Sequence, residues 1–224
     1  MIYSIDNLKI LPISEPGVFC YLVTNGSSSL LIDAGLSAFS GLLWRTIHPR
    51  ISGSAPLPVL ITHADPDHAG GLRYLRSRVL LNVSAPPLEK EAITAGQLSR
   101  PLRPHGLEKL VYPILGVFAT TKPQIVDNLL LPGAAIPGLP GLQVLPTPGH
   151  TPGHCSFFFE DEGILFCGDS LVYAHGRLFA STGANNWDDE LSNASFQKQK
   201  RLNPEWIFAG HFLLHSPAKE LAWS

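Results

Sequence analysis

Glycine and proline interrupt almost every apolar run of this 224-residue chain. The sequence holds 20 residues of each type, well above their average use in soluble domains. Breaks at this frequency argue against long helices and favour short strands and helices joined by tight turns. Because 45% of the residues are hydrophobic and only 15% are charged, the chain can still bury a full core. We therefore expect a folded α/β protein built from short elements.

The charge balance excludes one class of partner. Lys and Arg number 16 and Asp and Glu number 18, so the formal charge of −2 lacks the basic excess of a nucleic-acid binder. No apolar stretch is long enough for a membrane span, and the first residues lack the pattern of a signal peptide. We expect a cytoplasmic protein with a small-molecule substrate, no nucleic-acid partner and no membrane partner. The three cysteines, Cys20, Cys155 and Cys167, are expected as reduced core residues.

The first part of the chain alternates strands with short helices. We expect strands over Val18 to Thr24, Ser29 to Asp33, Pro58 to Thr62 and Val79 to Val83, and helices over Ser37 to His48, Pro66 to Arg76 and Ser84 to Gly96. The Asn25-Gly26 turn between the first two strands is typical of a β-hairpin. The fully apolar run after Pro58 predicts a strand buried under helices.

The second part repeats this style after an irregular segment. We expect strands over Gln124 to Leu131, Leu142 to Pro146, Cys155 to Glu160, Ile164 to Cys167 and Trp206 to Ala209, and a helix over Trp187 to Leu202. Residues 97–123 break any regular period and predict an insertion that forms a pocket wall or a lid. Since no linker or low-complexity tract occurs, we expect one domain over residues 1–224, made of two similar sheet halves.

Four potential metal ligands follow the buried strand at Pro58 to Thr62. They are His63, Asp65, Asp67 and His68 in the sequence His-Ala-Asp-Pro-Asp-His. Alternate residues of an extended segment point the same way, and a helix that begins at Pro66 turns the last histidine toward them. A purely structural alternative exists, in which Asp65 caps the helix, Asp67 favours its first turn and the histidines are unrelated.

Three further segments favour the metal interpretation. His150 lies in Thr-Pro-Gly-His-Thr-Pro-Gly-His between two strands, Asp169 follows the apolar strand before Gly168, and His211 follows the strand that ends at Ala209. Taken alone, each of these residues could equally well be an ordinary turn residue without a metal role. All four motifs, however, place a metal-ligand residue type after an apolar strand, where α/β folds assemble their sites.

In these motifs the sequence resembles the metallo-β-lactamase superfamily. The matching segments are Thr62 to Gly71, Thr147 to Gly153, Gly168-Asp169 and Gly210-His211, in the family's order. The resemblance implies an αββα sandwich of two mixed sheets with helices outside and a site for divalent metal ions at one edge. It implies that His63, residue 65 and His150 bind a first ion, that Asp67, His68 and His211 bind a second, and that Asp169 bridges them.

Asp65 departs from the family pattern, which has a second histidine at this position. With Asp65, Asp67 and Asp169, three negative charges and a bridging hydroxide balance two divalent ions, whereas the histidine version would leave one positive charge. We expect two ions with zinc first, and we hypothesise that the added carboxylate shifts preference toward iron or manganese.

The form of the motifs is most similar to glyoxalase II and N-acyl homoserine lactonases. We therefore expect hydrolysis of an ester, thioester or lactone by a metal-bound hydroxide, with Asp67 or Tyr173 assisting proton transfer. His175 and Arg177 are candidate substrate-binding residues. An iron-dependent oxidoreductase similar to persulfide dioxygenases is the alternative, and an inactive metal-binding module is a third. A β-lactamase role is less attractive, since such enzymes are generally exported.

Two residues beside the ligands have expected supporting roles. Asp33 matches a strand-end aspartate of the family and is expected to bond the His63 loop, although a turn role explains it equally well. His154 is expected to form hydrogen bonds within the Thr-Pro-Gly-His loop rather than to bind metal.

Overall fold

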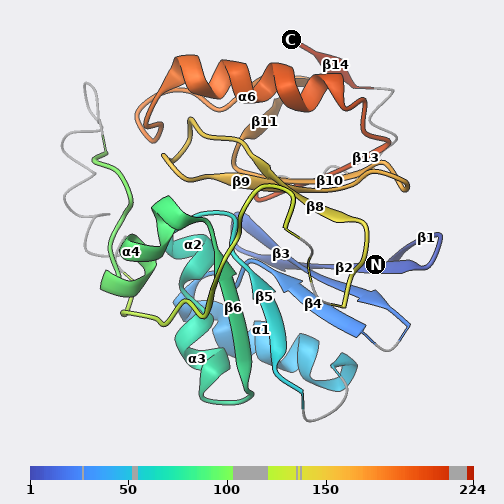
Figure 1. The fold of residues 1–224 in the computed structure, drawn as a ribbon, viewed down its shortest axis with the longest axis vertical. Helices are drawn as coiled ribbons and strands as arrows, with labels where there is room; N and C mark the ends of the chain where they lie inside the picture. The colour runs from blue at the N-terminus through green and yellow to red at the C-terminus, as the bar shows by residue number, and fades with distance from the viewer. Residues whose placement is uncertain (27, 52–54, 103–120, 135, 137, 212–220) are drawn as a thin grey trace.

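Two β-sheets lie face to face, and helices cover their outer sides (Figure 1). The computed structural model describes residues 1–26, 28–51, 55–102, 121–134, 136, 138–211 and 221–224. The expected αββα sandwich of two mixed sheets is confirmed.

The first sheet has seven strands that follow one another in chain order. They are β1 (Tyr3–Ile5), β2 (Leu8–Glu15), β3 (Val18–Asn25), β4 (Ser28–Ile32), β5 (Leu57–Leu60), β6 (Leu81–Ala85) and β7 (Asn128–Leu129). Strands β1 to β4 pair antiparallel, and β4 to β7 pair parallel. The parallel part brings the carboxyl ends of four neighbouring strands to one edge of the sheet.

The second sheet has the order β13-β10-β9-β8. Its strands are β8 (Leu142–Pro146), β9 (Cys155–Phe159), β10 (Ile164–Gly168) and β13 (Trp206–Ala209), and β10 pairs parallel with β13. A small third sheet consists of β11 (Leu171–Ala174), β12 (Arg177–Ala180) and β14 (Ala222–Trp223).

Short helices cover the first sheet and one longer helix covers the second (Figure 1). The former are η1 (Ser37–Phe39), α1 (Ser40–Ile47), η2 (His48–Arg50), α2 (Pro66–Ala69), α3 (Leu72–Arg76) and α4 (Pro87–Ala95), and the latter is α6 (Asp189–Arg201). Within the described part of the chain, no helix has the length and apolar character needed to cross a bilayer.

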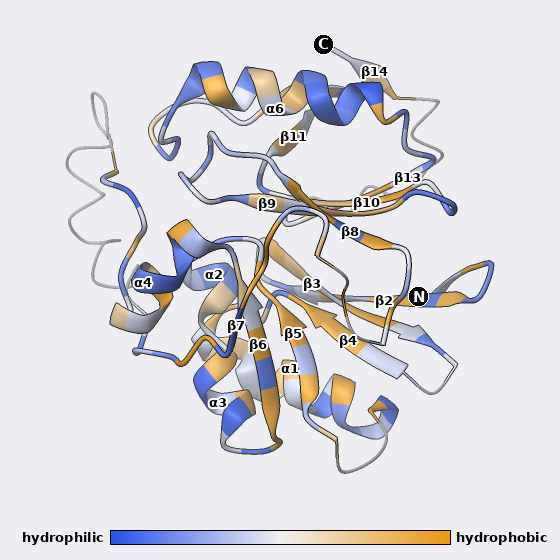
Figure 2. Cartoon of the chain, viewed as in Figure 1, coloured by the Kyte–Doolittle hydropathy of each residue, from blue (hydrophilic) through white to orange (hydrophobic). Residues whose placement is uncertain are grey.

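The core is divided into three apolar layers by the alternation of side chains along the strands. On β3, Cys20 faces the helices while its neighbour Tyr21 faces the second sheet. On β10, Phe166 lies between the sheets and Leu165 packs toward α6. Figure 2 shows apolar residues along the strands of both sheets. This period of two keeps both faces of each sheet buried and so fixes their spacing.

Most expected elements occur close to their expected positions. β8 and β13 have the expected bounds, and the antiparallel pairing of β3 with β4 confirms the hairpin. All three cysteines are free and buried, as expected. By contrast, the strand expected over Gln124 to Leu131 pairs only at β7, and β1, β2, β11, β12 and β14 were not anticipated.

The helix expected over Pro66 to Arg76 is divided at Gly70 and Gly71 into α2 and α3. At this point the chain passes close to the backbone after β4: the Gly71 N–H donates to the Gly35 carbonyl at 3.0 Å. A Cβ at Gly71 would collide with the Ala34 carbonyl oxygen. The close approach explains both the glycine pair and the interruption of the helix.

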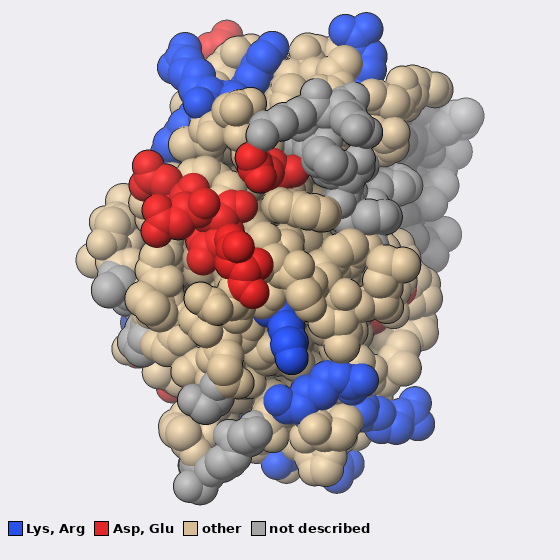
Figure 3. All heavy atoms as spheres, turned by 90° about the vertical axis from the view of Figure 1, so that its right-hand side faces the viewer, with Lys and Arg blue, Asp and Glu red and all other residues tan. Residues whose placement is uncertain are grey.

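Of the expected insertion over residues 97–123, the segment 103–120 lies outside the described residues. The single-domain organisation therefore stays a prediction, as does the lid. On one face of the molecule, acidic side chains gather at mid-height, and basic side chains lie above and below them (Figure 3). That face thus carries charges of both signs rather than one continuous basic surface.

Candidate metal centre

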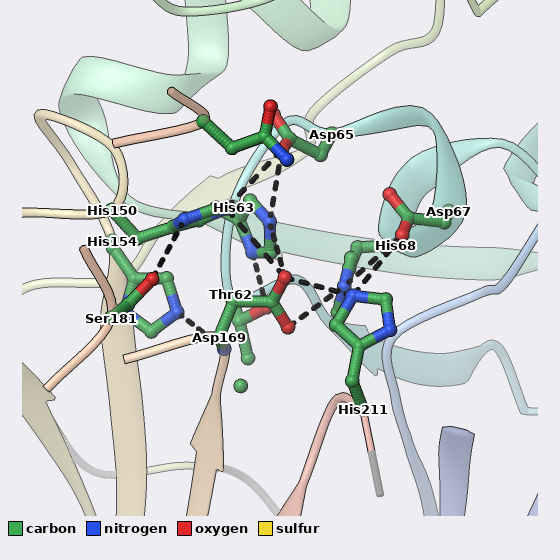
Figure 4. A network of polar contacts seen from close by, with 12 residues as sticks. Thr62, His63, Asp65, Asp67, His68, His150, His154, Asp169, Ser181 and His211 are labelled. Atoms are coloured by element: carbon green, nitrogen blue, oxygen red, sulfur yellow. Dashed lines mark hydrogen bonds and ion pairs between the residues drawn. The ribbon is translucent and has the colours of Figure 1, made fainter. Parts of the chain in front are cut away.

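Seven His and Asp side chains from both sheets converge at one edge of the sandwich (Figure 4). The first sheet contributes four of them through the segment after β5, and the second sheet contributes three through the β8–β9 loop and the segments after β10 and β13. They are His63, Asp65, Asp67, His68, His150, Asp169 and His211. The structure therefore brings together every residue that the sequence proposed as a metal ligand.

A first cluster consists of His63, Asp65 and His150, whose donor atoms lie within 4.8 Å of one another. Asp65 Oδ2 is 3.6 Å from His63 Nε2 and 3.3 Å from His150 Nε2. All three residues are buried. The cluster has the donor types and the size of a metal site.

A second cluster consists of Asp67, His68 and His211. Asp67 Oδ2 is 3.3 Å from His211 Nε2 and 3.9 Å from His68 Nε2. Its side chain is 28% exposed, in contrast to 9% for Asp169 and 13% for Asp65. Asp67 is thus the carboxylate of the centre that solvent reaches most easily.

Asp169 lies between the two clusters. One carboxylate oxygen, Oδ2, is 3.0 Å from His211 Nε2 and 3.6 Å from His150 Nε2. The other oxygen, Oδ1, is 3.2 Å from His68 Nε2. This is the position that a carboxylate shared between two metal positions would take.

Asp33 orients two of the histidines through the ring nitrogen that faces away from the centre. Asp33 Oδ2 is 2.8 Å from His68 Nδ1 and accepts a hydrogen bond from the Thr62 hydroxyl. The other oxygen, Oδ1, accepts the backbone N–H of Thr62. The Thr62 hydroxyl lies 2.9 Å from His63 Nδ1. With their Nδ1 atoms engaged, both histidines direct the Nε2 lone pair to the centre. The expected supporting role of Asp33 agrees with these contacts.

Three buried polar atoms at the centre make no regular hydrogen bond among the described residues, although two of them lie 3.2 Å apart as an ion pair. They are His63 Nε2, His68 Nε2 and Asp169 Oδ1. Buried polar atoms are almost always satisfied, and here the three residues form a further group whose donor atoms lie within 4.8 Å. A divalent cation satisfies such nitrogen and oxygen donors together, so the residues present fit a metal ion.

Electrostatic coupling holds the second cluster in a charged state when no metal is present. Burial lowers the pKa of His68, but the carboxylates of Asp169, Asp33 and Asp67 outweigh it and raise the pKa well above its usual value. Burial also lowers the pKa of His211, and its hydrogen bonds to Asp169 and Asp67 reverse the effect and raise the pKa to about 10. Protons therefore occupy the nitrogen lone pairs that a metal would use.

His154 has a structural role at the rear of the centre. Its Nε2 accepts the backbone N–H of Asp169 at 3.1 Å, and its Nδ1 lies 2.9 Å from the Thr147 hydroxyl. Burial, with the nearby charges of His63 and His150, holds the pKa of His154 well below its usual value. A neutral ring with both nitrogens engaged agrees with the expected hydrogen-bonding role.

Two buried charged residues near the ligands were missed in the sequence. The Glu89 carboxylate accepts the backbone N–H groups of Ala64 and Gly153, at 2.9 and 2.7 Å, and so joins the loops of the two sheets. Arg100 donates to both oxygens of Asp65, at 2.6 and 2.8 Å. A glutamate in a helix and an arginine in a proline-rich segment carry no local pattern that marks them.

The candidate substrate residues Tyr173, His175 and Arg177 lie on the β11–β12 hairpin. Tyr173 packs against the apolar cluster under α6, and Arg177 Nε donates to the Ser224 hydroxyl. His175 occupies the hairpin turn with φ of 51°. None of the contacts found among the described residues joins these three side chains to the seven residues of the centre, so their substrate roles stay predictions.

Comparisons with known proteins identify the family. The model of the metallo-beta-lactamase superfamily matches residues 14–211. A probable metallo-hydrolase of Bacillus subtilis, YflN, is 26% identical over 207 residues, which cover 86% of this chain and 78% of that protein. A hydroxyacylglutathione hydrolase of Shewanella sp. ANA-3 is 33% identical over 145 residues, 64% of this chain and 46% of that protein. The chain thus spans about half the length of that hydrolase.

Solved structures agree with this assignment. The protein TTHA1623, solved in a di-iron-bound form, is 27% identical with a TM-score of 0.67, and the match covers 92% of this chain and 93% of that one. The B3 metallo-beta-lactamase BLEG-1 is 26% identical with the same TM-score and covers 92% of both chains. With its sandwich fold and the His and Asp clusters of a metallo-hydrolase at the sheet edge, this chain belongs to the metallo-beta-lactamase superfamily.

Proposed function

We propose that this protein hydrolyses an ester, thioester or lactone bond in a small molecule and that the reaction depends on metal. The observation that carries the proposal is the second cluster, Asp67, His68 and His211, beside Asp169: the buried atoms His68 Nε2 and Asp169 Oδ1 make no regular hydrogen bond there, and a divalent cation would satisfy them. A bound ion lowers the pKa of a coordinated water toward neutrality and polarises a carbonyl oxygen. No nucleophilic side chain is then required.

The chain's own residues hold the donors in place and handle the proton. Asp33 fixes the ring of His68, and His154 positions the backbone of Asp169. Burial raises the pKa of Asp67, but His68 and His211 outweigh this effect and lower it, so Asp67 is ionised near neutral pH. As the most exposed carboxylate of the centre, it is placed to accept the proton of an incoming water. Tyr173 is retained as a second candidate for proton transfer.

The proposed substrate class rests on the motifs and on the names of the relatives. Several relatives are named hydroxyacylglutathione hydrolase, and such a protein cleaves a thioester. Because substrate choice in one fold depends on the loops around the site, we extend only the bond type to this chain. We further propose a cytoplasmic location and no nucleic-acid or membrane partner, with His175 and Arg177 as substrate contacts.

Zinc is the metal that we propose first, because the four histidines and three aspartates of the centre form a donor set that zinc accepts readily. Iron and manganese are the alternatives. Asp65 adds a hard oxygen donor, and the similar protein TTHA1623 has been solved with two iron ions.

The test combines metal content with a substrate screen. Purified protein is analysed by inductively coupled plasma mass spectrometry and assayed with ester, thioester and lactone substrates before and after chelation. We expect hydrolysis that chelation abolishes and zinc restores. His68→Asn should lose both metal and hydrolysis. The matched control His48→Asn replaces an exposed histidine outside the centre and should retain both. Full hydrolysis in metal-free protein would refute the proposal.

An iron-dependent oxidoreductase similar to persulfide dioxygenases is the second candidate, and the di-iron form of TTHA1623 is the observation that favours it. Iron as the main metal, oxygen consumption with glutathione persulfide and no hydrolysis of the ester series would replace the first proposal with this one.

A further inference from the structure

Arg100 makes a buried ion pair inside the first cluster. Its side chain is 1% exposed, and its guanidinium donates to both carboxylate oxygens of Asp65, at 2.6 and 2.8 Å. The Nε of Arg100 donates to the Asn185 carbonyl at 2.7 Å. This two-point geometry is the strongest form of an arginine–carboxylate contact, and the third bond fixes the plane of the guanidinium.

The same guanidinium also lies against a histidine of the cluster. Arg100 Nη2 is 3.2 Å from His150 Nε2, and His150 Nδ1 is 3.3 Å from Asn186 Oδ1. The amide nitrogen of Asn186 donates to the Ser181 carbonyl, which leaves its Oδ1 as the acceptor that faces His150. The His150 ring is therefore held with its Nδ1 toward Asn186 and its Nε2 toward Arg100 and Asp65.

Arg100 thus engages two of the three donors of the first cluster. Both oxygens of Asp65 and the Nε2 lone pair of His150 are the atoms with which these residues would bind a metal. A cation already lies on that side of the cluster. A second cation there would have to displace the guanidinium from its carboxylate and leave a buried positive charge without its partner.

The second cluster has no such competitor. Among the described contacts, Asp67, His68 and His211 meet only carboxylates, histidine rings and the Gly17 carbonyl, and no arginine or lysine reaches them. His68 Nε2 and Asp169 Oδ1, which make no regular hydrogen bond, lie at this cluster. Among the described residues, no fixed cation therefore competes with an ion at this cluster.

We propose that the protein binds one divalent ion, at Asp67, His68, His211 and Asp169, and that Arg100 takes the place of the other as a fixed cation. The guanidinium balances Asp65 and holds His150 in position, so the centre keeps a positive charge on the His63 side without a metal there. This proposal rests on the proposed metal dependence and concerns only the number of ions and the role of Arg100. It makes Arg100 a positioning residue.

Metal stoichiometry tests the proposal without reference to activity. Wild-type protein is stripped, loaded with excess zinc, desalted and analysed by native mass spectrometry and inductively coupled plasma mass spectrometry. We expect one zinc per chain. Arg100→Met, which removes the charge and keeps much of the side-chain volume, should double the stoichiometry to two. Arg100→Lys and the exposed control Arg73→Met should both remain at one.

Two zinc ions in the wild type, or one in a folded Arg100→Met variant, would overturn the proposal. If Arg100→Met fails to fold, His150→Gln provides the second variant: it should keep one zinc, because His150 does not bind the retained ion. Loss of that zinc would also overturn the proposal. Wild-type protein with one zinc and no hydrolysis would refute the proposed function alone. Two zinc ions with hydrolysis would refute only the role of Arg100.

Discussion

The two ligand clusters contain the same residue types, two histidines and one aspartate each, but their surroundings differ. The aspartate of the first cluster, Asp65, is bound by the guanidinium of Arg100. The aspartate of the second, Asp67, is paired with histidines and is the more exposed of the two. Ligand identity alone therefore does not determine which cluster is available to a metal, because a residue from a distant segment alters one of them.

The histidines of the two clusters also differ in their support. His68 is backed by the carboxylate of Asp33, which makes its Nε2 a stronger metal ligand. His150 is backed by the neutral amide of Asn186. The second cluster thus has no arginine on its donors and a carboxylate behind His68, while in the first Arg100 engages Asp65 and His150, and a neutral amide lies behind His150.

The largest expected effect comes from removing one histidine of each cluster in turn. His68→Ala should lower kcat/KM for the best substrate by roughly 10³-fold, about 4 kcal/mol of transition-state stabilisation, and should abolish zinc binding. His150→Ala should retain its zinc and lose less activity, because Arg100 rather than a metal lies against His150. Steady-state kinetics with metal analysis compares the two variants. Equal losses of metal would contradict the asymmetry.

The buried ion pair should be visible in stability. Asp65→Asn leaves the guanidinium of Arg100 buried without a counter-charge and should lower the free energy of unfolding by about 3 kcal/mol. The double variant Asp65→Asn/Arg100→Met removes both charges and should be less destabilised than Asp65→Asn alone. Urea denaturation of the metal-free proteins measures both values. A double variant whose loss equals the sum of the two single losses would rule out the pairing.

The charged support of the second cluster can be removed without disturbing the backbone. Asp33 has φ of 59°, a conformation that asparagine tolerates, so Asp33→Asn should fold normally. It should weaken zinc affinity by about 10- to 100-fold, since the support of His68 becomes neutral. Competition with a chromophoric chelator measures the affinity. Asp161→Asn, which neutralises an exposed carboxylate outside the centre, is the matched control and should leave the affinity unchanged.

The smallest effect concerns pH and again involves the second cluster. Burial lowers the pKa of His211, but its hydrogen bonds to Asp169 and Asp67 outweigh burial and raise the pKa from its usual 6.5 to about 10. The contribution of His211 to the stability of metal-free protein is therefore complete below about pH 6.5 and is lost as the pH rises toward 10. Zinc affinity should rise over the same range, because binding no longer displaces a proton. Denaturation series with and without zinc check both trends. A metal-free protein whose stability rises over this range would show that His211 is not protonated.

The sequence predicted the seven residues of the centre as a group because each follows a strand and the strand ends are local features. The apolar runs at β8 and β13 are bounded by glycine, proline or charged residues, so their limits were also readable. The glycine pair that divides α2 from α3 was visible as well. Its effect depends on a close approach to Gly35, however, and only the fold provides that contact.

Arg100 could not be predicted because its contacts are between residues far apart in the chain. It lies 35 residues from Asp65 and 50 from His150, in a segment without a hydrophobic period. A buried ion pair requires that the fold bring one side chain from each segment to a fixed distance. The local sequence of neither segment indicates that contact. The β2 strand was missed for a different reason: Pro12 lies within it and weakens any strand signal.

The origin of the ligands in both sheets gives a bound ion a mechanical role. Asp67 and His68 belong to one half of the sandwich and Asp169 and His211 to the other, so an ion held by all four would cross-link the halves across their seam. Mass action then raises the melting temperature with the concentration of free metal. Where metal is scarce, the two sheets would separate more often and expose the apolar layer between them to proteases. The lifetime of the protein in a cell would then depend on the concentration of available metal.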